Sequence, residues 1–139
     1  MADLERFVRA QDRSGVYLTA IAELTAGAKR SHWMWFVFPQ IAGLGTSDTA
    51  RHYAIADRSE AEAYLAHPVL GPRLRECVQL VADSTVPDAR DLLGCTDAMK
   101  LRSSVTLFQA VDPDEPMYQR VLDRYFDGLP DPATLERLG

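Results

Sequence analysis

Hydrophobic residues recur along most of this chain at intervals of three and four, the spacing that places side chains on one face of an α-helix. The pattern is clear at Leu4, Phe7 and Val8, and it returns from Tyr17 to Leu24 before Gly27. A sustained alternation of β-branched and polar residues, which would indicate half-buried strands, does not occur. The hydrophobic pattern therefore predicts an all-α (mainly α) protein.

Capping residues and helix breakers divide the chain into segments. Asp3 is suited to cap the first helix, Ser59 with Glu62 forms a capping box for residues 60–66, and Thr96 or Asp97 is suited to cap the helix that carries Leu101, Val105 and Phe108. Further helices are expected over 70–81, 87–94, 117–126 and 132–138, the last opened by Asp131-Pro132. We expect a single helical domain over residues 1–139, with about seven or eight helices.

Residues 29–47, which we call the aromatic segment, depart from this pattern because they contain a dense aromatic run from Trp33 to Phe38. As a helix capped by Ser31 the run would be apolar on all sides and therefore buried. As a strand it would place Trp33 and Trp35 on one face. We favour the short buried helix, because no other segment has the pattern of a partner strand.

Polar residues flank the aromatic run on both sides, and such groups can converge on the mouth of one pocket. His32 is the best candidate for a general acid or base by residue type, and Trp33 or Trp35 could stack on a base. Glycines in the second flank would let backbone N–H groups approach a ligand closely. The candidate binding residues are Lys29, Ser31, Trp33, Trp35, Gln40, Gly43, Gly45 and Ser47. The structural alternative is that the run only anchors the core.

A second polar cluster is expected on the helix over 97–108. At about 100° per residue, Asp97, Lys100 and Ser104 fall within about 60° of one another, directly beside the apolar stripe. The Asp97–Lys100 pair could be a simple ion pair at the rim of the core. It could also line a cleft, with Lys100 holding an anion and Asp97 acting as a base or as an acceptor for ribose hydroxyls.

Composition narrows the function classes. The chain has 139 residues, 47% of them hydrophobic, and a net charge of −5, which argues against binding to a nucleic-acid backbone. No apolar run approaches a membrane span or a signal peptide, so we expect a cytoplasmic protein with a small-molecule or protein partner and no contact with a membrane. No metal or cofactor motif is present, and none is predicted. The only two lysines, Lys29 and Lys100, lie in the two segments with chemical character.

Within the aromatic segment, the stretch SHWMWFVFPQIAGLG resembles the signature of a bacterial family known as domain of unknown function 1810, some members of which carry an older "calpastatin" label. The segments DLERFVRAQ, EAEAYLAHPVLGPRL, DAMKLRSSVTLF and TLERL also match the family's pattern, so that the resemblance covers nearly the whole chain. The family has no established activity. Its layout is distantly similar to the NADAR superfamily, helical proteins that process ADP-ribose conjugates.

The resemblance implies a hydrolase that cleaves an N-glycosidic bond in an ADP-ribose-like or nucleotide-like conjugate. The catalytic candidates are Asp97, Lys100 and His32, with Ser104 and the polar flanks of the aromatic run as substrate-binding residues. Asp97 would stabilise the positive charge of an oxocarbenium-like transition state, and a lysine would bind a phosphate. The alternative is a non-catalytic helical module that binds a ligand or a protein, for example a regulator or an antitoxin-like partner. The oligomeric state is not predicted.

Overall fold

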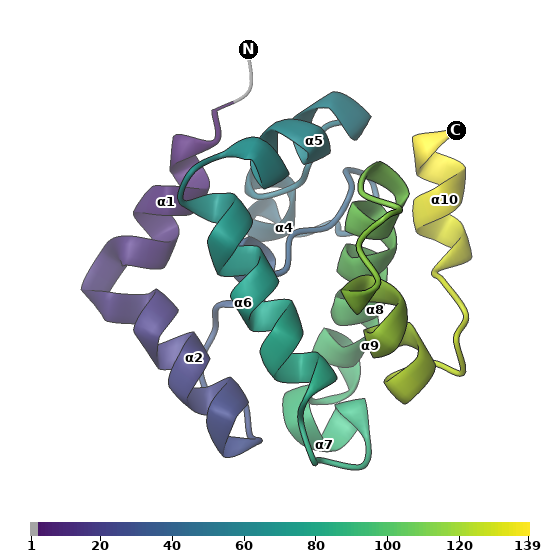
Figure 1. Ribbon diagram of the computed structural model, residues 1–139. Coiled ribbons are helices and arrows are strands. Elements are labelled where there is room, and N and C mark those ends of the chain that lie inside the picture. Colours follow the sequence, from purple (N-terminus) through teal and green to yellow (C-terminus); the bar gives the residue numbers. More distant parts are fainter. Residues whose placement is uncertain (1–2) are drawn as a thin grey trace.

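The computed structural model describes residues 3–139, which form ten α-helices joined by short loops (Figure 1). Within these residues the strand-like pairing is a single β-bridge between Ile41 and Ile55. The helices are α1 Glu5–Asp12, α2 Val16–Ala26, α3 Met34–Val37, α4 Asp48–His52, α5 Arg58–Ala66, α6 Leu70–Ala82, α7 Ala89–Leu93, α8 Cys95–Val111, α9 Met117–Tyr125 and α10 Pro132–Leu138. The prediction of an all-α fold is confirmed, with more helices than the seven or eight expected.

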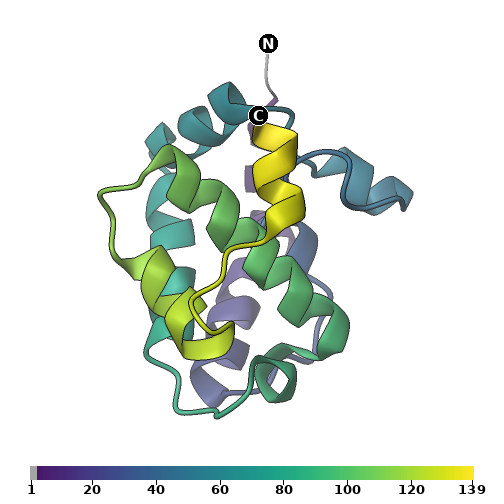
Figure 2. The ribbon, with the colours of Figure 1, turned by 90° about the vertical axis from the view of Figure 1, so that its right-hand side faces the viewer.

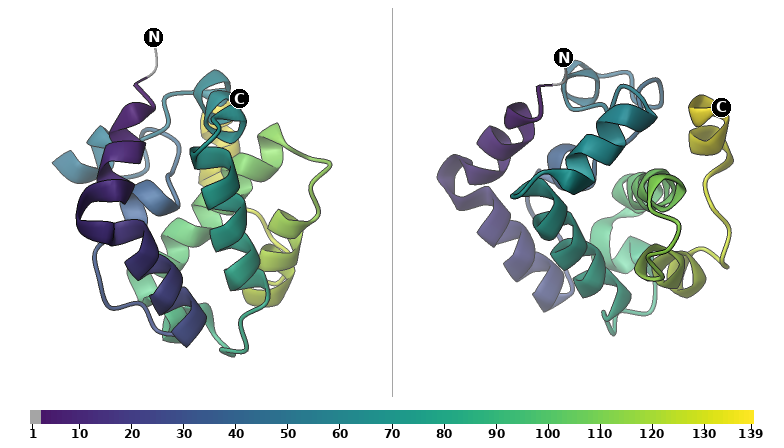
Figure 3. Two further views of the ribbon diagram at one scale, coloured as in Figure 1. Left: turned by 60° about the vertical axis from the view of Figure 1, so that its left-hand side comes forward. Right: turned by 45° about the horizontal axis from the view of Figure 1, so that its top comes forward.

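Two long helices, α6 and α8, organise the fold. The helix α6 packs against α2, α5 and α9, while α8 packs against α5, α7, α9 and α10. A 3-10 turn at Arg13–Gly15 joins α1 to α2, and Figure 3 shows these two helices as a bent pair along one side of α6. The helices α7 and α4 lie toward opposite ends of the molecule in Figures 1 and 2.

Aromatic side chains from several helices fill the centre of the protein. Phe7, Tyr64 and Phe108 are fully buried, and the ring of Tyr64 packs against both phenyl rings at centroid distances of 5.1 and 5.3 Å. Burying each such ring stabilises the fold by about 1.5–3 kcal/mol. Trp33 and Phe38 extend this core into the aromatic segment, with their ring centroids 6.3 Å apart.

The aromatic run contains a short buried helix, α3 over Met34–Val37, and no strand, as we favoured from the sequence. The expected capping by Ser31 is wrong, because the helix begins after Trp33 and the hydroxyl of Ser31 donates to Glu23 instead. Pro39 follows directly after Phe38 and is buried. The carboxylate of Glu23 therefore holds this segment against α2, and no side chain of the segment caps the helix α3.

Several predicted helix starts need correction. Leu4, not Asp3, precedes α1, and Asp57 caps α5 in place of Ser59, accepting from the N–H of Glu60 at 2.9 Å. The helix α8 begins at Cys95, so that neither Thr96 nor Asp97 caps it. The reason is Gly94, whose φ of +90° lets the chain turn directly from α7 into α8.

Other ends follow the predictions more closely. Asp131 caps α10, accepting from the N–H of Thr134 at 3.3 Å. The inward side chain of α10 is Thr134, because the expected Leu135 is exposed and Leu138 is only partly buried. The short helix α4, capped by Ser47, was not predicted. Of the helices within residues 3–139, none has both the length and the apolar content to cross a bilayer.

Candidate functional site

Two predicted regions meet where the chain leaves α2 and where α8 begins. The Nζ atom of Lys29 lies 2.8 Å from one carboxylate oxygen of Asp97, and the Nζ of Lys100 lies 3.5 Å from the other oxygen. A backbone hydrogen bond of 2.8 Å from the N–H of Lys29 to the carbonyl of Leu92 ties this stretch to the end of α7. We call Lys29, Asp97, Lys100 and Trp35 the Asp97 cluster.

The ammonium group of Lys29 is held from several sides. It donates to the carbonyl of Ser31 at 2.5 Å, pairs with Asp97, and lies 5.1 Å from the ring centroid of Trp33. Only 8% of its side chain is exposed. Lys29 therefore holds the aromatic segment against α8 and has little surface left for a ligand.

Lys100 is more loosely held. Its contacts are the longer ion pair to Asp97 and the ring of Trp35, whose centroid lies 4.7 Å from Nζ, within cation–π range. Trp35 is partly exposed, whereas Trp33 is fully buried. The side chains of Lys100 and Asp97 are 20% and 18% exposed. These two residues and Trp35 can therefore reach a ligand, whereas Lys29 cannot.

The exposed His32 stands beside Trp35, with ring centroids 6.5 Å apart. His52 and His67 lie elsewhere: His52 packs on Tyr53, and His67 contacts Glu5 and the backbone at the start of α6. Among the three histidines, His32 is the one next to the Asp97 cluster.

Glu23, which the sequence reasoning missed, fixes the geometry of this region. Its carboxylate accepts from the N–H groups of Arg30 and Ser31 at 2.7 and 3.0 Å, from the Ser31 hydroxyl at 2.5 Å, and from the indole of Trp33 at 3.0 Å. Burial alone would raise the pKa of Glu23, but these hydrogen bonds outweigh it and lower the pKa to about 2. Glu23 is therefore a positioning residue. The sequence feature that could have drawn attention to Glu23 is its place directly before Leu24, a residue of the apolar face of α2.

Charge in this region is nearly balanced. Lys29 and Lys100 contribute two positive charges, while Asp97 and Glu23 contribute two negative ones. Asp97 also lies in the first turn of α8, where the positive end of the helix dipole favours a carboxylate. A bound anion must therefore compete with Asp97 for Lys100, the less tightly held lysine.

The remaining predicted residues make other contacts. Ser104 is fully buried, and its hydroxyl has no hydrogen-bond partner within residues 3–139. Gly43 lies against Arg137 of α10, Gly45 lies against Ala50, and Ser47 caps α4.

Gln40 lies at the β-bridge, where its carbonyl accepts from the N–H of Ile55 at 2.8 Å. The contacts of residues 40–47, the second flank of the aromatic run, thus join it to α4, α10 and Ile55. They do not join it to the Asp97 cluster.

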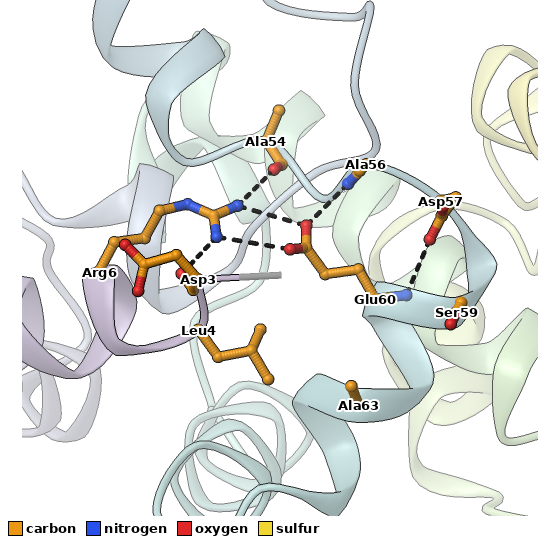
Figure 4. A pocket seen from close by; sticks show the side chains of 9 residues that line it. All are labelled: Asp3, Leu4, Arg6, Ala54, Ala56, Asp57, Ser59, Glu60 and Ala63. Atoms are coloured by element: carbon orange, nitrogen blue, oxygen red, sulfur yellow. Dashed lines mark hydrogen bonds and ion pairs between the residues drawn. The ribbon is translucent and has the colours of Figure 1, made fainter. Parts of the chain in front are cut away.

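A cavity of about 740 Å³ lies between α1 and α5 (Figure 4). Arg6 spans it, donating to the carbonyls of His52 and Ala54 at 2.8 Å each and pairing with Glu60 at 3.3 Å. Glu60 also accepts from the N–H of Ala56 at 2.8 Å. Because these charged groups are already satisfied by the protein, the pair serves to join α1 and α5 and offers little to a ligand. Sequence reasoning missed this pair, since its partners are separated by more than fifty positions along the chain.

Within residues 3–139, no three His, Cys, Asp or Glu side chains gather in an arrangement that could hold a metal ion. Cys77 is buried and Cys95 is exposed, and both are free thiols. The chemistry available at the Asp97 cluster is therefore that of one carboxylate, two ammonium groups, an indole and a nearby imidazole.

Comparison with known proteins gives a family and a close structural relative. A family model described as "Protein of unknown function (DUF1810)" matches residues 1–138. The crystal structure of the conserved hypothetical protein Rv1873 from Mycobacterium tuberculosis superposes with a TM-score of 0.94 at 45% sequence identity, covering 98% of this chain and 96% of that one. A comparison with curated proteins found no match.

Proposed function

The chain belongs to the DUF1810 family, and we propose that it is a cytoplasmic hydrolase that cleaves an N-glycosidic bond in an ADP-ribose-like or nucleotide-like conjugate. The observation that supports this proposal is the convergence of Lys29, Asp97 and Lys100, with Trp35 beside them. Lys29 and Asp97 are far apart in the sequence but adjacent in space. The distant similarity of the family to the NADAR superfamily is part of the proposal.

Ligand binding in this proposal begins at Lys100 and Trp35. The exposed face of the indole stacks on a base, and the ammonium group takes a phosphate oxygen. Since Lys100 lies 3.5 Å from Asp97, transfer of this lysine to a phosphate releases one carboxylate oxygen. Lys29 keeps its 2.8 Å contact to the other oxygen and holds Asp97 in place.

The released oxygen of Asp97 then accepts a proton from a water molecule that attacks the anomeric carbon. The bond from this carbon to the nitrogen of the base breaks and the nitrogen takes the electron pair. A base that would otherwise leave as an anion takes a proton from His32, whereas the positively charged nicotinamide nitrogen of NAD becomes neutral and takes none. The transition state resembles an oxocarbenium ion, which a nearby carboxylate stabilises electrostatically. Glu23 takes no part in proton transfer, because its hydrogen bonds hold the pKa at about 2.

Hydrolysis is tested by incubating the protein with NAD and with an ADP-ribosylated nucleoside and measuring free ADP-ribose by chromatography. Asp97→Asn should lower turnover by about a hundredfold or more, as is typical when a general base is lost. The matched control is Asp91→Asn, an exposed aspartate on neighbouring α7, which should leave turnover unchanged. Equal turnover by the wild type and Asp97→Asn would refute the catalytic role.

A second candidate function is a non-catalytic binding module, and one observation favours it. Both oxygens of Asp97 are already paired and both oxygens of Glu23 accept hydrogen bonds, so within residues 3–139 neither carboxylate of this region is free to act as a base in the unliganded protein. A thermal-shift measurement with ADP-ribose, NAD and mononucleotides separates the cases, because a ligand raises the unfolding temperature whether or not it is cleaved. Stabilisation that Lys100→Met abolishes, without release of product by the wild type, would indicate the binding module.

A further inference from the structure

A second polar cavity lies away from the Asp97 cluster, between the loop 43–46 and α10. Its volume is about 570 Å³, and it is lined by Leu44, Ala133, Glu136 and Arg137. Figure 2 shows α10, in yellow, beside the blue segment that leads into α4. The volume falls within the range that small-molecule ligands occupy.

Arg137 supplies an uncommitted positive charge at this cavity. Its guanidinium group lies so close to Gly43 that a Cβ atom at this position would collide with it. Within the part of the chain that the structure describes, the side chain of Arg137 forms no hydrogen bond or ion pair. A planar guanidinium presents five N–H donors, a geometry that matches phosphate and carboxylate oxygens.

The loop opposite Arg137 contributes Leu44 to the lining of the cavity, and Gly43 and Gly45 flank this residue. Gly43 has a φ of +99°, in the left-handed region that favours glycine. The N–H groups of Gly43 and Gly45 donate to no acceptor within residues 3–139. Backbone N–H groups in such turns form anion-binding concavities in many proteins.

The loop is held at both of its ends, so its shape does not depend on a ligand. Before it, the N–H of Ala42 donates to Ile55 at 2.8 Å, and after it Ser47 caps α4 by accepting from Ala50 at 3.1 Å. Gly45 packs directly on Ala50, a contact that a larger residue would obstruct. A fixed loop lowers the entropic cost of binding, because little of it needs to become ordered.

We propose that this cavity binds the phosphate group of a small molecule, with Arg137 and the N–H groups of Gly43 and Gly45 as its donors. The site shares no residue with the Asp97 cluster and goes beyond the proposed hydrolysis. Among the described residues that line the cavity, Glu136 is the acidic one. Its carboxylate weakens the attraction for a bare anion and can accept from a hydroxyl group of the molecule that bears the phosphate.

The test uses inorganic phosphate and pyrophosphate as probes, titrated into the full chain and followed by calorimetry and by the amide signals of ¹⁵N-labelled protein. We expect saturable shifts of the Gly43 and Gly45 amides. Arg137→Gln should weaken binding about tenfold or more, because a hydrogen bond to a charged group is lost. Glu136→Gln should tighten binding about two- to fivefold by removing the opposing charge.

Arg13→Gln is the matched control, because Arg13 is exposed on the turn between α1 and α2 and has no recorded partner. Loss of affinity in Arg137→Gln but not in Arg13→Gln supports the site. Equal effects of the two variants, or the absence of saturable shifts at Gly43 and Gly45, would overturn it. Asp97→Asn should leave the affinity read from the Gly43 and Gly45 amide shifts unchanged, so that failure of the hydrolase proposal and failure of this one are distinguishable.

Discussion

Glu23→Gln is expected to destabilise the protein and to flatten its stability profile at acidic pH. The carboxylate accepts four hydrogen bonds from residues 30–33, and these bonds place the aromatic segment against α2. The substitution can keep its amide oxygen on the N–H groups of Arg30, Ser31 and Trp33, which all bond to Oε1, but it places an NH₂ group against the Ser31 hydroxyl, which donates to Oε2 in the wild type. The loss therefore follows mainly from the missing charge, because hydrogen bonds to a charged acceptor are stronger than those to a neutral amide.

The magnitude follows from the pKa of Glu23, which falls from an ordinary value of 4.5 to about 2 in the folded protein. At about 1.4 kcal/mol per pKa unit this corresponds to about 3 kcal/mol, and to about 2 kcal/mol once solvent screening of a partly exposed group is included. Because the folded-state pKa lies below that of the unfolded chain, this stabilisation is complete above pH 4.5. It is lost progressively as the pH falls toward 2.

The assay is urea denaturation of the wild type and of Glu23→Gln at pH 7 and at several values between pH 4.5 and 2.5, a window set by the pKa of Glu23. The control is Glu62→Gln, because Glu62 is exposed on α5 and its side chain forms no hydrogen bond within residues 3–139. We expect Glu23→Gln to lose about 2 kcal/mol at pH 7 and to depend less on pH within this window. If it is as stable as Glu62→Gln at pH 7 and retains the wild-type pH dependence, the positioning role of Glu23 is refuted.

Three further predictions concern other parts of the molecule. Arg6→Met should lower the free energy of unfolding by about 3–5 kcal/mol in a urea titration, because it leaves Glu60, 6% exposed, without its cationic partner; a loss below about 1 kcal/mol would contradict this account of the pair. Lys100→Met should change the fluorescence emission of Trp35 and cost about 0.5–1 kcal/mol of stability, whereas an unchanged spectrum would mean that the two side chains do not stack in solution. Gly43→Ala should cost about 1–2 kcal/mol, since the φ of +99° is unfavourable for any residue with a Cβ atom, and a neutral effect on the thermal midpoint would argue against this loop conformation.

The helical fold and several of its helix ends could be predicted from local patterns alone. The spacing of apolar residues identified the long helices, and Gly27 and Asp131 marked ends that the structure also has. The errors arose where a single residue acts through its backbone conformation. Gly94 starts α8 earlier than a search for polar capping side chains suggests, because its positive φ replaces a cap.

The candidate site was predictable only in part. Lysine is rare in this chain, and this rarity drew attention to Lys29 and Lys100, its only two lysines. Helical spacing then placed Asp97 beside Lys100. The ion pair between Lys29 and Asp97 was not predictable in this way, because it depends on how the stretch after α2 lies against α8. The same holds for Glu23, whose role arises from contacts with residues that follow it in the next loop.

The most direct test of the Asp97 cluster as a ligand site is a titration of ¹⁵N-labelled protein with ADP-ribose, followed through the two indole N–H signals. Trp35→Phe assigns these signals and leaves the buried Trp33 in place. We expect the Trp35 signal to move saturably while the Trp33 signal, whose N–H is bonded to Glu23, changes little. The account also predicts that Lys100→Met weakens this response. An unchanged Trp35 signal at millimolar ADP-ribose, or an equal response in Lys100→Met, would contradict it.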